Sequence, residues 1–277
     1  RENDFGSRNI HNKLAKIGIN ISQGTIAGWI YRNKEPFIIK ILKQIKNGSE
    51  ELTPEKAYII GTLCGDGYTT TKYRIGLGVC DQEFTNYFQH CIEKAYGVTY
   101  SINKIKPQKS NFSNNPKSQY IILFGSKLIF QDLQRYCTSF KSYEWKVPTQ
   151  IKNAPKEIQA SFIKGFADSE GCVRFRNGSG EIAIYSHNKN GLEDIQRLLK
   201  NTFEIRVSLN QKKACYYLDI IDYISLKKFY DEIGFVIKRK QETLKQVLSS
   251  YKRKGLRRYS KEFKLLAMQL LKQGINH

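Results

Sequence analysis

The sequence predicts an α+β protein built on a duplicated, pseudo-two-fold core, because one order of elements occurs twice along its 277 residues. Each copy is expected to contain a helix, two strands, a second helix, two further strands and a closing helix. The copies begin with similar segments, YIIGTLCGDG at 58–67 and FIKGFADSEG at 162–171. These segments align in register on Asp66 and Glu170. We therefore expect two similar halves with helical additions at both ends.

Within the halves, the elements follow from alternating and helical apolar patterns. The first motif helix has Thr53 as its N-cap and Pro54 in its first turn. The other elements of the first half are predicted as strands within 69–79, 98–106 and 119–124 and helices over 82–96 and 127–139. Those of the second half are predicted as strands within 172–186, 204–212 and 215–221 and helices over 190–202 and 225–233. Residues 108–118 are a polar insertion, and Asn177-Gly178 predicts a hairpin turn.

The predicted domain organisation has four parts. These are a helical segment at 1–50, a first half at 51–152, a second half at 153–250, and a basic linker with a C-terminal helix at 251–277. Residues 260–274 have the pattern of an amphipathic helix that begins at Ser260 and ends at Gly274. One interpretation is that this helix packs on the N-terminal segment and completes a three-helix unit.

The N-terminal segment has the pattern of a helix-turn-helix. Ser22 is a natural N-cap for a second helix over about 23–31, whose exposed side is polar and basic. The DNA contacts predicted there are Gln23, Thr25 and Arg32. The alternative is a helical hairpin that only packs on the next domain. A further helix from Pro36 and a linker at 47–49 are expected to follow.

The composition is strongly basic. Forty-six Lys+Arg against 25 Asp+Glu give a formal net charge of +21 and a pI of about 9.6, which attracts polyanions. Because the charge is spread along the chain, nucleic acid is favoured over a membrane surface. The sequence has no apolar run of about 18 residues, no secretory signal and six singly placed cysteines. We therefore expect a cytoplasmic protein with reduced thiols and no zinc–thiolate site.

Small residues precede an acid at matching positions in the two motif segments. They are Gly61 and Gly65 in the first copy and Gly165 and Ser169 in the second. Residues four apart share one helix face, so small ones let two helices approach closely. Asp66 and Glu170 would then meet where the helices end, an arrangement that is unfavourable unless a proton or a cation bridges the two charges. Carboxylate oxygens favour Mg²⁺, which suits phosphodiester hydrolysis by metal-bound water. The structural alternative is a packed helix that ends in a turn.

The two segments resemble the paired motifs of the LAGLIDADG homing endonucleases in their single-chain form. The WKVP run at 145–148 and the IGFVIKRKQ run at 233–241 are also similar to the family, so the resemblance covers about 53–248. It implies two antiparallel β-saddles laid in the major groove of DNA, with the motif helices at their centre. It also implies that a monomer, needing no protein partner, cleaves both strands of a long asymmetric site.

The resemblance further implies a divalent-metal site. Asp66 and Glu170 would be the catalytic metal ligands, with Gly65 and Ser169 beside them. Mg²⁺ is the expected cofactor, and Mn²⁺ or Ca²⁺ would substitute for it in binding. Asp168 is not expected to be a principal ligand.

In one respect the sequence departs from the family. Family members carry Gln or Lys near the end of the second strand to organise water around the metals, where this chain has Val79-Cys80 and Ser186-His187. His187 is expected either to order water or contact phosphate, or to be a plain surface residue. The groove contacts predicted in the two halves are Lys72, Arg74, Arg174, Arg176, His187, Lys238, Arg239 and Lys240.

The leading hypothesis is an intron-encoded, Mg²⁺-dependent homing endonuclease. One alternative is a non-cleaving DNA-binding transcriptional regulator of LAGLIDADG/helix-turn-helix type, and another is an intron RNA maturase. The presence of both Asp66 and Glu170 favours the endonuclease, because related regulators have lost the acids. An intein is not favoured, because the chain neither starts with Cys or Ser nor ends with His-Asn.

Overall fold

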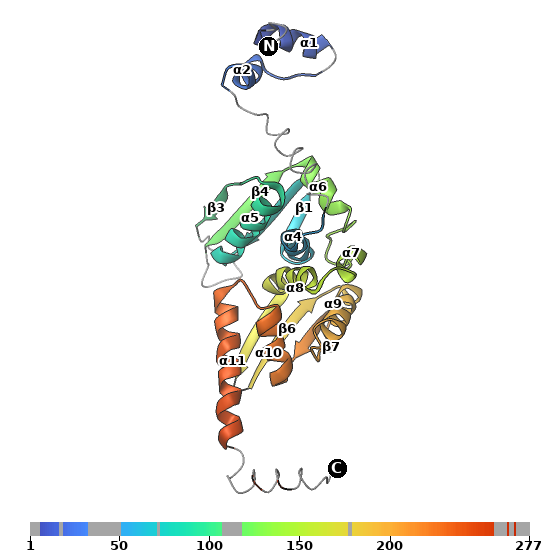
Figure 1. Ribbon diagram of the computed structural model, residues 1–277, viewed down its shortest axis with the longest axis vertical. Helices are drawn as coiled ribbons and strands as arrows, with labels where there is room; N and C mark the ends of the chain where they lie inside the picture. The colour runs from blue at the N-terminus through green and yellow to red at the C-terminus, as the bar shows by residue number, and fades with distance from the viewer. Residues whose placement is uncertain are drawn as a thin grey trace. The chain divides into compact units, whose positions relative to one another are not determined.

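The computed structural model describes residues 6–16, 19–32, 51–70, 73–106, 118–176 and 179–257, together with Leu265 and Gln269. Contacts divide the chain into one compact unit at residues 1–51 and a second at 52–277, whose elements Figure 1 labels. Several predicted features lie outside the described residues. They are the helix from Pro36, the linker at 47–49, most of the insertion at 108–118, the turn Asn177-Gly178 and the helix at 260–274 apart from Leu265 and Gln269.

The described residues of the N-terminal unit form two helices, α1 (Ser7–Lys16) and α2 (Gln23–Tyr31). The Ser22 hydroxyl accepts a hydrogen bond from the Thr25 N–H at 3.2 Å, so the predicted helix at 23–31 and its cap are confirmed. His11 Nδ1 lies 2.7 Å from the Ile21 carbonyl oxygen and links α1 to the segment before α2. Ile26 is buried at the centre of this hairpin.

The first half of the larger unit begins at α4 (Pro54–Cys64), where the Thr53 hydroxyl accepts from the Lys56 N–H at 3.3 Å. Its antiparallel strands pair in the order β1-β2-β4-β3. Its remaining elements are β1 (Gly67–Thr70), β2 (Arg74–Val79), α5 (Gln82–Tyr96), β3 (Ile102–Ile105), β4 (Gln119–Gly125), α6 (Lys127–Gln134) and the short α7 (Thr149–Lys152). The helix predicted over 82–96 is therefore confirmed, whereas α7 was not predicted.

The second half repeats this arrangement, with antiparallel strands in the order β5-β6-β8-β7. Its elements are α8 (Lys156–Glu170), β5 (Gly171–Arg176), β6 (Ser179–Ser186), α9 (Lys189–Asn201), β7 (Ser208–Lys212), β8 (Cys215–Ile220) and α10 (Tyr223–Glu232). The predicted duplicated α+β fold is thereby confirmed. A further helix, α11 (Lys238–Arg257), runs through the boundary that we predicted after residue 250. That boundary is wrong because the basic run is helical there.

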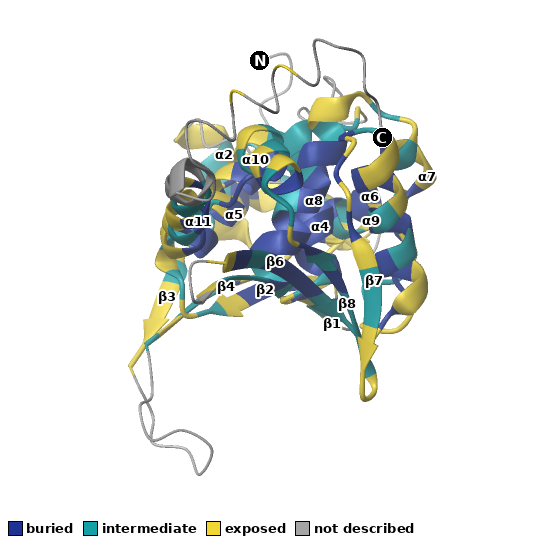
Figure 2. Cartoon of the chain, turned by 90° about the horizontal axis from the view of Figure 1, so that it is seen from below, coloured by how far each residue is buried: buried dark blue, intermediate teal, exposed yellow. Residues whose placement is uncertain are grey.

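The two sheets form one curved layer, and the helices of the larger unit cover one side of it (Figure 2). Alternation along the strands explains this, because every second residue points to the same face. Ile75 and Leu77 of β2 and Ile182 and Ile184 of β6 are fully buried, whereas Arg74 beside Ile75 is exposed. None of the described helices is both long and apolar enough to cross a membrane.

The connection between the halves is anchored by Trp145, the first residue of the WKVP run. Its side chain is only 1% exposed. The Asn188 side-chain amide donates to the Trp145 carbonyl at 2.6 Å, and Gly191 lies so close that a Cβ there would be 2.4 Å from the indole ring. The linker is therefore part of the second half's core.

Candidate functional site

The centre of the larger unit is the contact between the two motif helices, α4 and α8 (Figure 1). A Cβ added to Gly61 would lie 2.1 Å from the Phe162 carbonyl oxygen, and one added to Gly165 would lie 2.3 Å from the Tyr58 carbonyl oxygen. Neither distance is possible for a real side chain. The backbones therefore touch, and both predicted small positions lie at the crossing.

The same crossing brings the predicted acids to one place. α4 ends at Cys64, so Asp66 follows its last turn, and Glu170 is the last residue of α8. A Cβ on Gly65 would lie 2.4 Å from Ser169 Cβ and 3.2 Å from Glu170 Cγ. The ends of the two helices thus converge, one from each half, as the sequence predicted.

The electrostatics of the acid pair reflect this convergence. Glu170 is half-buried, and desolvation, followed by the charge of Asp66, raises its pKa to about 7. Desolvation also raises the pKa of Asp66, an effect that the Lys240 ammonium opposes. The charge of His187 acts in the opposite direction on Glu170 and lowers its pKa. Such a pair gains from a proton or a bound cation.

The two carboxylates suit a hard cation that takes few of its ligands from the protein. Asp66 and Glu170 offer carboxylate oxygens, which suit Mg²⁺, and Mg²⁺ usually keeps several waters beside one or two carboxylates. No cluster of three or more His, Cys, Asp or Glu side chains suited to a metal occurs among the described residues. The Ser169 hydroxyl donates to the Gly165 carbonyl at 3.1 Å and is thus already engaged within α8.

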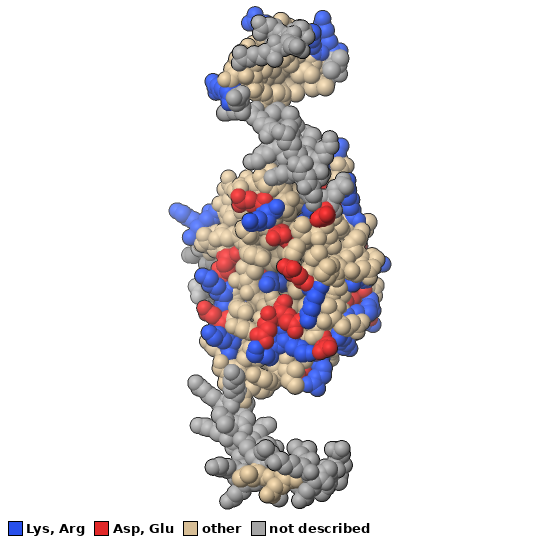
Figure 3. Space-filling model, in the orientation of Figure 1, with Lys and Arg blue, Asp and Glu red and all other residues tan. Residues whose placement is uncertain are grey.

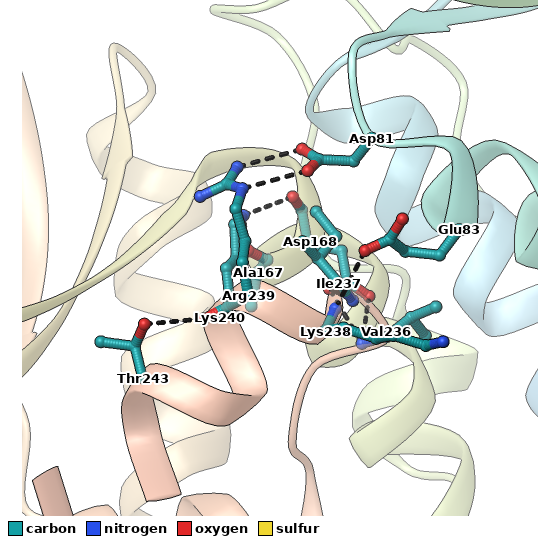
Figure 4. A network of polar contacts seen from close by, with 10 residues as sticks. All are labelled: Asp81, Glu83, Ala167, Asp168, Val236, Ile237, Lys238, Arg239, Lys240 and Thr243. Atoms are coloured by element: carbon teal, nitrogen blue, oxygen red, sulfur yellow. Dashed lines mark hydrogen bonds and ion pairs between the residues drawn. The ribbon is translucent and has the colours of Figure 1, made fainter. Parts of the chain in front are cut away.

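Asp168 lies beside the pair but is turned into the protein, where it is 1% exposed (Figure 4). Its carboxylate accepts from the Tyr58 hydroxyl at 2.9 Å and from the N–H groups of Val236 and Ile237 at 3.1–3.3 Å. Burial raises the pKa of Asp168 to about 6, and these hydrogen bonds oppose that rise. Asp168 therefore joins α4, α8 and the segment before α11, and its exclusion from the ligand set stays a prediction.

Lys240, predicted to contact DNA, is instead a buried residue with 5% exposure. Its ammonium donates to the carbonyl oxygens of Ala167 at 3.1 Å and Asp168 at 2.6 Å, the end of α8 directly before Glu170 (Figure 4). Burial lowers the pKa of Lys240. The prediction is wrong because Lys240 falls on the buried stripe of α11, which also contains Leu244 and Val247. That helical spacing was the signal in the sequence.

The two basic residues before Lys240 lie where the halves meet. The Arg239 guanidinium binds both carboxylate oxygens of Asp81 at 3.0 Å, and the Lys238 backbone N–H donates to Glu83 at 3.2 Å (Figure 4). Both acids belong to the start of α5 in the first half. The Arg239 side chain is still 66% exposed, so the ion pair with Asp81 leaves it accessible to a ligand.

The other predicted contacts are dispersed. Arg74 is exposed on β2, and Arg174 on β5 pairs with Glu181 at 2.8 Å. His187 is exposed after β6, with Nδ1 3.1 Å from the Ala214 carbonyl oxygen. Lys72 lies outside the described residues, as does the side chain of Arg176. Gln23, Thr25 and Arg32 are exposed in the N-terminal unit.

The second-strand positions differ between the halves. Val79 ends β2 and is followed by the exposed Cys80, so the first half has no strongly polar group there. In the second half the Ser186 hydroxyl accepts from the Asn188 N–H at 3.1 Å, and His187 is near enough to Glu170 to influence its charge. The two acids thus have different neighbours.

Comparison with known proteins finds a matching family model and similar folds. Residues 157–234 match the family model of the LAGLIDADG-like domain. The fold is similar to the homing endonuclease I-WcaI bound to its DNA recognition sequence, with a TM-score of 0.54, 14% identity and coverage of 75% of this chain and 93% of that one. Full-length DUF199/WhiA from Thermatoga maritima gives a TM-score of 0.52 at 14% identity, covering 82% of this chain and 71% of that one.

The duplicated core therefore has the LAGLIDADG fold. Its second half is similar to the LAGLIDADG-like domain, and the fold is shared with the homing endonuclease I-WcaI and with DUF199/WhiA.

Curated relatives are similar mainly over a segment. A probable translation initiation factor IF-2 of Methanocaldococcus jannaschii is 29% identical over 222 residues, covering 76% of this chain and 17% of that protein. The Bacillus subtilis ribonucleoside-diphosphate reductase NrdEB subunit alpha is 29% identical over 180 residues, covering 58% of this chain and 16% of that protein. This chain thus spans about a sixth of the length of those relatives. An uncharacterized protein of M. jannaschii, MJ0398, is 25% identical with 90% coverage of both chains.

Proposed function

We propose that this chain is a sequence-specific double-strand DNA endonuclease of the homing type. The observation that carries the proposal is the convergence of Asp66 and Glu170 at the crossing of α4 and α8, where Gly65 lies against Ser169 and Glu170. One acid comes from each half of a duplicated unit. A single chain therefore has two related acidic groups, as an enzyme acting on two DNA strands requires.

The chain's own residues would hold a divalent cation and set its position. When bound, Mg²⁺ would supply charge stabilisation at the phosphate and a water activated as nucleophile. Asp66 and Glu170 would bind it through their carboxylate oxygens. The charge of Asp66, which contributes to the raised pKa of Glu170, supports this role, because a cation would offset the repulsion between the two acids. Lys240 holds the last carbonyls of α8 and so fixes the turn from which Glu170 emerges.

DNA would lie on the face of the sheets that the helices leave open (Figure 2). Arg74 and Arg174 lie on strands of that layer. Over the helical face, Figure 3 shows acidic side chains intermixed with basic ones. The net charge of +21 adds a long-range attraction to phosphate. The exposed Gln23, Thr25 and Arg32 of the N-terminal unit would add further contacts.

A cleavage assay tests the proposal. Wild type is incubated with a plasmid library of candidate target sites and Mg²⁺, beside Asp66→Asn and Glu170→Gln, and binding is measured on the same DNA. We expect both variants to bind and neither to cleave. Glu93→Gln is the matched control, because it neutralises an exposed acid on α5 outside the site. It should cleave as wild type does.

The second candidate is a DNA-binding regulator that does not cleave. Two observations favour it: the fold is shared with DUF199/WhiA, and the first half has Val79 and Cys80 where polar residues are expected. Wild type that binds one duplex tightly, yet never nicks it with any divalent metal, would decide for the regulator.

A further inference from the structure

The open faces of the two sheets differ in chemistry. In the first sheet, strand register places Tyr68 opposite Gly76, and Gly76 opposite Leu123 of β4. Ile105 of β3 lies on this same face, away from the buried residues. Tyr68, Ile105 and Leu123 are 38%, 40% and 43% exposed. Large apolar side chains thus reach solvent where DNA would lie.

On this face β2 carries two glycines, Gly76 and Gly78, which add no side chain of their own. A Cβ on Gly76 would lie 2.4 Å from Cζ of the Tyr68 ring, so the ring rests directly on the strand. Gly78, two residues on, faces the same side, with only Ile121 in ordinary contact at 3.5 Å. Arg74 lies on this face as well, opposite Thr70. The register also places the exposed Asn103 and Gln119 on this face, opposite Ile121 and Ile105 respectively. The face therefore combines exposed apolar side chains with a few polar ones and a cationic neighbour, which favours a polyanion over an apolar protein partner.

The second sheet is polar at the equivalent place. Arg174 binds Glu181 at 2.8 Å and also donates to the Tyr185 hydroxyl. Tyr185 stacks on Tyr217 of β8, with ring centroids 5.3 Å apart. Asp219 of β8 lies opposite Ala183 of β6 in the strand register. Burial, followed by the charge of Glu181, raises the pKa of Asp219. This face offers donors and acceptors instead of methyl groups.

The major groove presents both kinds of surface. Thymine carries a 5-methyl group that apolar side chains contact, guanine accepts from Arg, and cytosine donates to Asp or Glu. We propose that the two halves read the target by different chemistry. The first sheet reads a thymine-rich half-site through methyl contacts of Ile105, Leu123 and Tyr68. The second reads guanine and cytosine edges through Arg174 and its acidic neighbours. This rests on the sequence-specific duplex binding of the proposed function, not on cleavage.

Replacing thymine by uracil tests the proposal, since it removes only the methyl group. Duplexes are selected from a randomised library by the full chain in Ca²⁺, and uracil is then placed in one half of the selected site at a time. We expect roughly fourfold weaker binding for each contacted methyl in one half, the equivalent of about 0.8 kcal/mol for a buried carbon. Uracil in the other half should leave the Kd unchanged.

A double variant tests whether residues of the first sheet cause the weaker binding of uracil-containing duplexes. Ile105→Ser with Leu123→Ser should lose the thymine–uracil difference at the bases that these two side chains contact, leaving only the part that Tyr68 contributes. Ile224→Ser is the matched control, because Ile224 is 59% exposed on helix α10, and it should keep the wild-type difference. Arg174→Ala should instead relax base preference in the half-site that is insensitive to uracil. If the double variant fails to fold, the uracil series with wild type still decides.

Each remaining outcome counts against the idea. Equal uracil effects in both halves, or none in either, would overturn the division of chemistry while leaving specific binding intact. Enrichment of no duplex, or retention of structured RNA in preference to every duplex, would overturn the proposed function and this inference together. Loss of cleavage alone touches only the endonuclease proposal.

Discussion

A methyl group at Gly61 should force the two motif helices apart. The Cβ of Gly61→Ala would lie 2.1 Å from the Phe162 carbonyl oxygen and 3.1 Å from the Phe166 nitrogen. Ordinary contact begins near 3.4 Å, and the atoms that clash are backbone, so no side-chain rotation relieves the overlap. The helices would have to separate by more than about 1 Å in a core packed as densely as a crystal.

The cost can be bounded from two opposing effects. Overpacking a core costs about 1–3 kcal/mol, occasionally more, and a rigid backbone contact belongs at the upper end. Alanine regains up to about 1 kcal/mol of helix propensity relative to glycine. We therefore expect the free energy of unfolding to fall by about 2 kcal/mol or more. Because Asp66 and Glu170 emerge from this crossing, cleavage should fall further than DNA binding does.

Urea unfolding followed by circular dichroism measures the effect. Gly78→Ala is the matched control, because its Cβ would meet Ile121 at an ordinary 3.5 Å, and its free energy of unfolding should change by less than about 1 kcal/mol. A loss below 1 kcal/mol in Gly61→Ala, with cleavage unchanged, would refute the claim that backbone contact positions the acids.

Three other predictions concern the polar groups around the crossing. Lys240→Met should lower the free energy of unfolding by about 2–4 kcal/mol, since two carbonyls of α8 lose a charged donor. A variant with the same urea midpoint as wild type would contradict this role of Lys240. Asp168→Asn should cost about 2–3 kcal/mol by the same assay, because an amide cannot accept from Tyr58 and two backbone N–H groups together. Glu170 has a folded pKa of about 7 against an ordinary 4.5, so folding binds its proton more tightly. Its contribution to stability is present below pH 4.5 and is lost as the pH rises to 7. Glu170→Gln should flatten that part of the stability profile, and an unchanged slope would show that another group causes it.

Much of the fold was predictable because its signals are local. The amphipathic pattern over 82–96 and the left-handed Gly97 that follows it mark α5. Thr53 and Ser22 cap their helices as their side-chain chemistry suggests. The acid pair could be inferred because the duplication places Asp66 and Glu170 in register. α7 was missed because four residues carry no readable period.

The duplication, the element order, the small residues of the motif segments and the two acids at the ends of the motif helices can all be read from the sequence. Which charges are buried depends on how the elements pack together. Lys240 sits under the end of α8, and Lys56, fully buried, pairs with Asp132 at 2.9 Å within the first half. Neither role was predicted, because the residues next to a lysine do not show whether its ammonium faces water or buried oxygen atoms. That difference depends on partners far away along the chain, which only the packed fold brings together.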